Sequence, residues 1–244
     1  MPPASLNRFD AIPLRWLNSL VGMSVNFDKG IDFISGNHLF EGAVFMALFW
    51  WYWFRKVDTG IAQRTREHLL CTLGAGVVGI LLARILALLL PFRVRPRFEP
   101  ALHFIPPNGE ASDAFMAWSA FPSDHAVLFS ALAAGLCFIS WRTGLLAMLY
   151  SFLIIDFPRV YLGFHYPTDI LAGALLGAML GYGMNLPPLR NRMAGVALQW
   201  ESTTPGAFYA ALFILSFQLS TMFESLRYAA LATVHFAGRM AAAT

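Results

Sequence analysis

Six apolar runs constrain the fold of this chain more than any other feature. Each is close to the length that a membrane-spanning helix needs, about 20 residues. Charged residues make up 13% of the chain and hydrophobic residues 57%, whereas soluble domains carry about 25% charged residues. We therefore predict an all-α fold, a polytopic membrane helix bundle with about six transmembrane helices. The predicted spans are residues 38–54, 68–92, 121–140, 144–162, 167–186 and 207–223.

The segment before the first span differs from the rest, because charged side chains interrupt its apolar residues. Residues 12–33 contain two aspartates, an arginine and a lysine. This pattern favours an amphipathic helix in the membrane interface over a seventh crossing. We predict three parts along the chain: an N-terminal interfacial segment 1–37, a six-span membrane domain 38–224 and a C-terminal tail 225–244.

The positive charges lie in loops beside the apolar runs rather than on one basic face interleaved with aromatic residues. The net charge of +3 therefore indicates no nucleic-acid partner, and membrane lipids are the expected surroundings. By the positive-inside rule, the more basic loops are cytoplasmic. We expect an integral protein of a bacterial inner membrane, with the polar motifs described next on the outer, periplasmic face. The basic residues of the expected cytoplasmic side are Arg55, Lys56, Arg64, Arg66, Arg142, Arg190 and Arg192.

His165 and Asp169 stand four residues apart at the start of the fifth predicted span, so a helix places them on one face. A carboxylate that accepts from one imidazole nitrogen fixes the tautomer and leaves the other nitrogen free to attack. Attack on phosphorus would give a phosphohistidine that water later hydrolyses. The alternative is an interfacial histidine with an incidental partner.

The string Pro122-Ser123-Asp124-His125 directly precedes the third apolar run. Serine is a favoured N-cap, and the free N–H groups at a helix start bind anions. Ser123 and the neighbouring amides are candidates to hold phosphate oxygens, and His125 is a candidate general acid for the leaving oxygen. The alternative is an ordinary helix cap.

Arg95 and Arg159 fall at the same predicted membrane face as these two motifs. Phosphoryl transfer needs negative charge on the equatorial oxygens stabilised, and two guanidinium groups can supply this. The alternatives are loop solvation for Arg95 and a snorkelling side chain for Arg159. Asp156, three residues before Arg159, is a candidate to orient it.

Together, Arg95-Pro96, Pro122-Ser123-x-His125 and Arg159-x5-His165-x3-Asp169 resemble the phosphatidic acid phosphatase type 2/haloperoxidase superfamily, in its integral-membrane lipid phosphatase branch. Its usual pattern is Lys-x6-Arg-Pro, Pro-Ser-Gly-His and Ser-Arg-x5-His-x3-Asp. The resemblance implies a lipid phosphate hydrolase that works without metal or cofactor. It also implies His165 as nucleophile, Asp169 as its orienting partner and His125 as acid. The implied phosphate ligands are Arg95, Arg159, Ser123 and the Asp124 amide.

The chain departs from that pattern at three positions. Leu88 stands where the family lysine would fall, and Arg93 or Arg97 could supply the missing charge as phosphate-binding residues. Asp124 replaces the usual glycine, so its carboxylate must turn away or pair with an arginine such as Arg97, because a free carboxylate would repel phosphate. Pro158 replaces the usual serine.

These residues predict a phosphatase acting on a lipid phosphomonoester or diphosphate, with undecaprenyl diphosphate as the best single candidate. A phosphotransferase that uses the same site with a lipid or sugar acceptor stays open. So does a transporter or lipid-binding protein with a degenerate site.

Three further features carry weaker expectations. Cys71 and Cys137 lie in apolar runs and form no metal-like cluster, so we expect buried small side chains. Residues 93–120 form a long loop, either a lid or a passive surface. In the fifth predicted span, a glycine stripe favours close packing within the bundle and leaves a homo-oligomer open; its members are Gly173, Gly177, Gly181 and Gly183.

Overall fold

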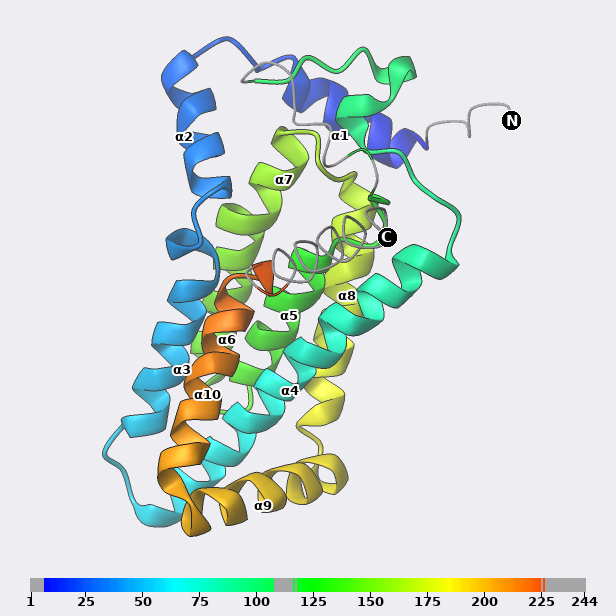
Figure 1. The fold of residues 1–244 in the computed structure, drawn as a ribbon. Helices are drawn as coiled ribbons and strands as arrows, with labels where there is room; N and C mark the ends of the chain where they lie inside the picture. Colours follow the sequence, from blue (N-terminus) through cyan, green and yellow to red (C-terminus); the bar gives the residue numbers. More distant parts are fainter. Residues whose placement is uncertain (1–6, 108–115, 117, 225, 227–244) are drawn as a thin grey trace, which may run out of the picture.

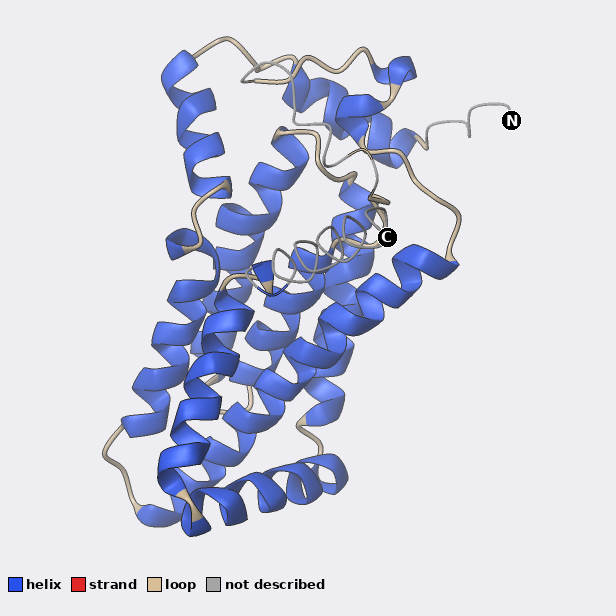
Figure 2. Cartoon of the chain, in the orientation of Figure 1, coloured by secondary structure: helices blue, strands red, loops and turns tan. Residues whose placement is uncertain are grey.

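The computed structural model describes residues 7–107, 116, 118–224 and 226. In these residues the regular secondary structure is helical throughout (Figure 2), so the all-α prediction is confirmed. The predicted C-terminal tail and the middle of the 93–120 loop lie outside the described residues. Most helices run lengthwise through the molecule, the helix of residues 59–89 crosses them obliquely, and further helices lie at the two ends (Figure 1).

Six apolar helical segments lie where the six spans were predicted. They are η1 with α3 (Leu39–Ala43 and Val44–Phe54), α4 (Thr59–Leu89), α5 (Asp124–Leu136), α6 with η5 and α7 (Trp141–Tyr150, Ser151–Asp156 and Phe157–Tyr161), α8 (Pro167–Met184) and α10 (Pro205–Ser220).

By length and composition, α4 and the unit Trp141–Tyr161 are long and apolar enough to cross a membrane. Among the described residues, α8 and α9 (Pro187–Thr203) would add a third span if the pair, bent by 72°, counts as one. The segments Leu39–Phe54, Asp124–Leu136 and Pro205–Ser220 are apolar but shorter. The shortest of them, α5, is buried along nearly its whole length, so its apolar side chains contact other helices.

Both ends of the bundle carry helices that lie outside the six apolar segments. At one end are α1 (Arg8–Asn18) and α2 (Val25–Ser35), where a single interfacial helix was predicted. Helix α1 buries Leu14 and Leu17 against the bundle and exposes Phe9, Ile12 and Trp16. At the other end α9 runs across the bundle (Figure 1), and the sequence reasoning did not anticipate it.

Three of the four glycines of the α8 stripe pack against α5, as predicted for contact within the bundle, whereas an added Cβ on Gly183 would meet nothing within 4 Å. A Cβ on Gly173 would lie 2.6 Å from the Ser123 carbonyl oxygen, and one on Gly177 would lie 2.1 Å from the Val127 carbonyl oxygen. A Cβ on Gly181 would likewise lie 2.3 Å from the Ala131 carbonyl oxygen. These glycines therefore let the two backbones touch, and they bring together the helix ends that carry the two histidine motifs.

Candidate active site

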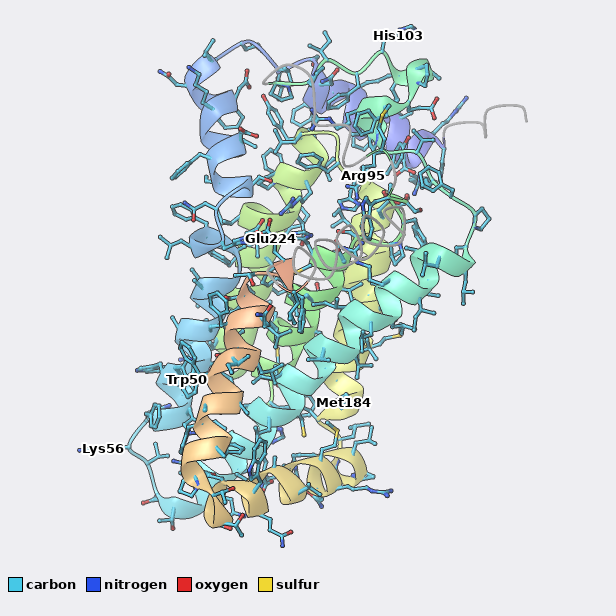
Figure 3. All side chains as sticks on the ribbon, viewed as in Figure 1. Trp50, Lys56, Arg95, His103, Met184 and Glu224 are labelled. Atoms are coloured by element: carbon cyan, nitrogen blue, oxygen red, sulfur yellow. The ribbon has the colours of Figure 1, made fainter. Side chains whose placement is uncertain are left out.

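The N-terminal ends of α5 and α8 form the floor of the site. Ser123 caps α5, with its Oγ accepting from the Ala126 N–H at 3.4 Å, and its own N–H donates to the Asp169 carbonyl at 3.3 Å. Pro167 begins α8, a position where a missing N–H costs nothing. The two polar motifs predicted from sequence therefore meet at one end of the bundle. Arg95 lies at this end and Lys56 at the opposite end (Figure 3).

His165 is buried, with 3% of its surface exposed. Its Nδ1 lies 2.8 Å from the Ala120 carbonyl oxygen, which can only accept, so Nδ1 carries the proton and Nε2 holds the free lone pair. The closest Asp169 oxygen is 3.8 Å from Nδ1, longer than the hydrogen bond expected from sequence. Burial lowers the pKa of His165 below its usual value, which favours the neutral, nucleophilic ring.

Asp169 is completely buried, and both of its oxygens are engaged. One accepts from the Tyr166 N–H at 2.8 Å and so caps α8, and the other pairs with Arg93. Arg93 also pairs with Asp10 of α1 at 2.6 Å. Two carboxylates therefore hold the Arg93 guanidinium, and a phosphate that binds Arg93 would have to compete with both of them.

His125 lies between a carboxylate and a guanidinium. Its Nδ1 is 3.1 Å from Oδ1 of Asp124, and its Nε2 is 2.7 Å from Nη2 of Arg159. Asp124 turns its second oxygen to Arg84 of α4, and the two form an ion pair. The expected pairing of Asp124 with Arg97 is thus wrong, and Arg84 is the partner.

Arg159 pairs with Glu41 of η1, a buried carboxylate 3.9 Å from Nε2 of His125. Glu41 is 1% exposed, and it also lies 3.5 Å from Nδ1 of His38. The suggested orienting residue for Arg159, Asp156, instead accepts from Ser151 at 3.3 Å. Glu41 therefore takes the place that the sequence reasoning gave to Asp156.

Arg95 reaches into the site from the loop after α4. Its guanidinium donates to the carbonyl oxygens of Phe164 at 3.1 Å and of Trp118 at 3.4 Å. Burial lowers the pKa of Arg95 to about 10, so the group keeps its charge at neutral pH. Arg97 lies over the Phe164 ring, 5.0 Å from its centroid, so the role of phosphate ligand suggested for it stays a prediction.

Sequence reasoning missed Arg84, Glu41 and Asp10. The first two had a usable signal, because a charged residue inside an apolar span is costly unless it has a partner. Asp10 had none, since its partners Arg93 and Thr168 are distant in sequence.

The fold and site together define a helical integral membrane protein whose histidines, carboxylates and arginines converge at one end of the bundle. The chain belongs to the PAP2 superfamily, whose family model matches residues 67–192.

Two curated relatives and one solved structure extend this comparison. The chain is 27% identical over 119 residues to undecaprenyl-diphosphatase BcrC of Bacillus subtilis, covering 49% of this chain and 57% of the relative. It is 29% identical over 85 residues to an undecaprenyl-diphosphatase of Sulfolobus acidocaldarius, covering 35% of each. The matches thus span less than two thirds of these relatives. The fold resembles the crystal structure of Aquifex aeolicus LpxE, with a TM-score of 0.52 and 21% identity over 75% of this chain and 98% of that one.

Proposed function

We propose that this chain is a membrane lipid phosphatase that hydrolyses a lipid phosphomonoester or diphosphate through a phosphohistidine, with undecaprenyl diphosphate as the first candidate substrate. The observation that carries the proposal is the convergence of His165, His125, Arg95 and Arg159 at the capped ends of α5 and α8. Family membership and the names of the two relatives support it.

In the proposed reaction, Nε2 of His165 attacks phosphorus while the bond to the lipid oxygen breaks. His125 gives its Nε2 proton to that departing oxygen. Water then attacks phosphorus, the P–N bond breaks, and His125 takes a proton from the water. Arg95, Arg159 and the amides at the start of α5 stabilise the charge on the equatorial oxygens.

The proposed orientation places this site on the outer face of the membrane, since the opposite end carries Lys56 and the basic loops. A lipid substrate would enter from the bilayer, keeping its tail in the apolar layer while its phosphate meets the arginines.

Phosphate release from purified protein in detergent and EDTA tests the proposal. The panel is undecaprenyl diphosphate, phosphatidic acid, phosphatidylglycerol phosphate and a lipid A diphosphate. We expect release from at least one lipid, and His165→Ala should reduce it at least about 10³-fold because no nucleophile remains. A folded His165→Ala protein with full activity would refute the mechanism. Movement of labelled phosphate into a second lipid, with little free phosphate, would favour a phosphotransferase.

A further inference from the structure

The two site histidines have matching surroundings. Near Nδ1 of His165 lies the carboxylate of Asp169, whose other oxygen pairs with Arg93. Near Nδ1 of His125 lies the carboxylate of Asp124, whose other oxygen pairs with an arginine of α4. The first of these arrangements contains the family aspartate, whereas the second is built from residues outside the usual pattern.

We propose that Asp124, held in place by Arg84, is the positioning residue of His125 and keeps the proton on its Nδ1, so that Nε2 alone exchanges protons with the reacting oxygens. This inference rests on the phosphatase function proposed above. It accounts for two of the three positions at which the chain departs from the family pattern, because Asp124 positions His125 and the cation of α4 stands at position 84 instead of 88.

Hydrogen-bond geometry supports this assignment of the tautomer. Oδ1 of Asp124 lies 3.1 Å from Nδ1 of His125 and accepts from the His125 backbone N–H at 3.0 Å, so the carboxylate is fixed against the ring. On the other side of the ring, Nη2 of Arg159 lies 2.7 Å from Nε2. Since a guanidinium can only donate, Nε2 is the acceptor and Nδ1 is the nitrogen that carries hydrogen.

Arg84 offsets the negative charge that Asp124 places beside the proposed phosphate site. Asp124 is 8% exposed, and a buried carboxylate without a partner is costly and would repel a phosphate. Arg84 pairs with it and also lies over the Trp118 ring, 4.8 Å from the ring centroid. Leu88, one turn further along α4, is 86% exposed. The cation of α4 that pairs with Asp124 therefore stands at position 84, one turn before position 88, where the family pattern has a lysine.

A proton kept on Nδ1 of His125 serves both proposed steps, because it leaves Nε2 as the nitrogen that gives and takes the second proton. When phosphate draws Arg159 toward its oxygens, Nε2 of His125 is free to hold a second proton, so the ring enters the first step as the imidazolium and passes this Nε2 proton to the departing lipid oxygen. The neutral ring is then ready to take a proton from the attacking water at the same Nε2. A negative charge at Nδ1 favours the protonated ring in the first step and stabilises the imidazolium formed in the second.

Leaving-group dependence tests the role of Asp124. The probes are an alkyl phosphate, whose alkoxide needs a proton to depart, and a nitrophenyl phosphate bearing the same alkyl chain, whose phenolate does not. For Asp124→Asn we expect kcat/KM to fall about 10²-fold on the alkyl phosphate and no more than about threefold on the nitrophenyl phosphate. His125→Ala should show the same selectivity with a larger loss. Equal losses on both probes for Asp124→Asn would overturn the inference.

A double-mutant cycle tests the pairing of Arg84 with Asp124. Arg84→Leu leaves Asp124 unpaired, whereas the double variant Arg84→Leu/Asp124→Gly also removes the carboxylate, so we expect the double variant to lose less kcat/KM than the product of the two single losses. Arg84→Lys keeps the charge and should lose less than Arg84→Leu. Arg192→Leu, an exposed arginine of α9, is the control for loss of a positive charge far from the site. Asp124→Gly alone completes the cycle, and a double variant as poor as the product of the Arg84→Leu and Asp124→Gly losses would overturn the pairing.

The outcomes separate the two proposals. No release by the wild-type protein from any probe or panel lipid would refute the proposed function, and this inference with it. Active wild-type protein whose His125→Ala variant is selective, but whose Asp124→Asn variant is not, would refute the inference alone.

Discussion

At the scale of single residues, the site is a set of charged side chains that pair with one another. Arg159 illustrates this, because its guanidinium contacts Glu41 and the Ser35 carbonyl oxygen. A phosphate that binds Arg159 must therefore compete with a carboxylate of the same chain.

Glu41→Gln removes the competing charge and keeps the side-chain shape. We expect KM to fall several-fold, since Arg159 becomes freer to bind phosphate, and the free energy of unfolding to fall by about 3 kcal/mol, since a buried ion pair loses one partner. Kinetics and thermal unfolding of the same preparation measure both effects. A higher KM would mean that Glu41 holds Arg159 in its binding position instead.

The lowered pKa of His165 predicts the acid limb of the pH profile. Activity needs the neutral ring, so kcat/KM should persist below about pH 6.5, the ordinary value for histidine. The same shift predicts that stability decreases as pH falls from that value, because the unfolded chain takes up the proton first. The pH profile should be measured with two substrates whose phosphates have different pKa values. An acid limb that appears at the same pH with both substrates belongs to the enzyme and not to the substrate. An acid limb above the ordinary histidine value contradicts the prediction.

At the scale of secondary-structure elements, the contact between α5 and α8 sets the geometry of the site. The glycine spacing predicted that the fifth span packs closely within the bundle, but it did not predict that α5 is the helix it contacts. Helix α9 could not be predicted in the same way, because residues 187–203 contain charged residues and only Ala194 is buried. A helix that lies across the end of a bundle needs no apolar run, so its main local signal was Pro187 at the first helical position.

Gly177→Ala should separate the two motif helices. Its Cβ would fall 2.1 Å from a backbone oxygen of α5, which cannot move alone, so we expect a loss of stability of about 1–3 kcal/mol and a fall in kcat/KM as the histidines move apart. Thermal unfolding and kinetics check this. Gly183→Ala on the same helix is the matched control, since nothing lies within 4 Å of its added Cβ. Similar behaviour of the two variants would argue against the close contact.

At the scale of the whole molecule, the sequence predicted the membrane class, the six apolar segments and five candidate site residues that the structure brings to one end of the bundle: His165, Asp169, His125, Arg95 and Arg159. Each depends on a local pattern: an apolar run, a cap or a fixed spacing. The partners of those residues could not be predicted, because Arg84, Glu41 and Asp10 reach them across the fold. Local patterns identify candidate reactive side chains, whereas only the three-dimensional arrangement identifies their partners.

Helix α1 is joined to the candidate active site through Asp10. Asp10 accepts from the Thr168 N–H at 2.9 Å and pairs with Arg93, the same arginine that holds Asp169. Shortening the chain to its membrane-spanning part would remove one of the two acids on that arginine and uncover the start of α8. Helix α1 therefore supports the candidate active site as well as lying at the surface, and we expect a shortened version of the protein to need it.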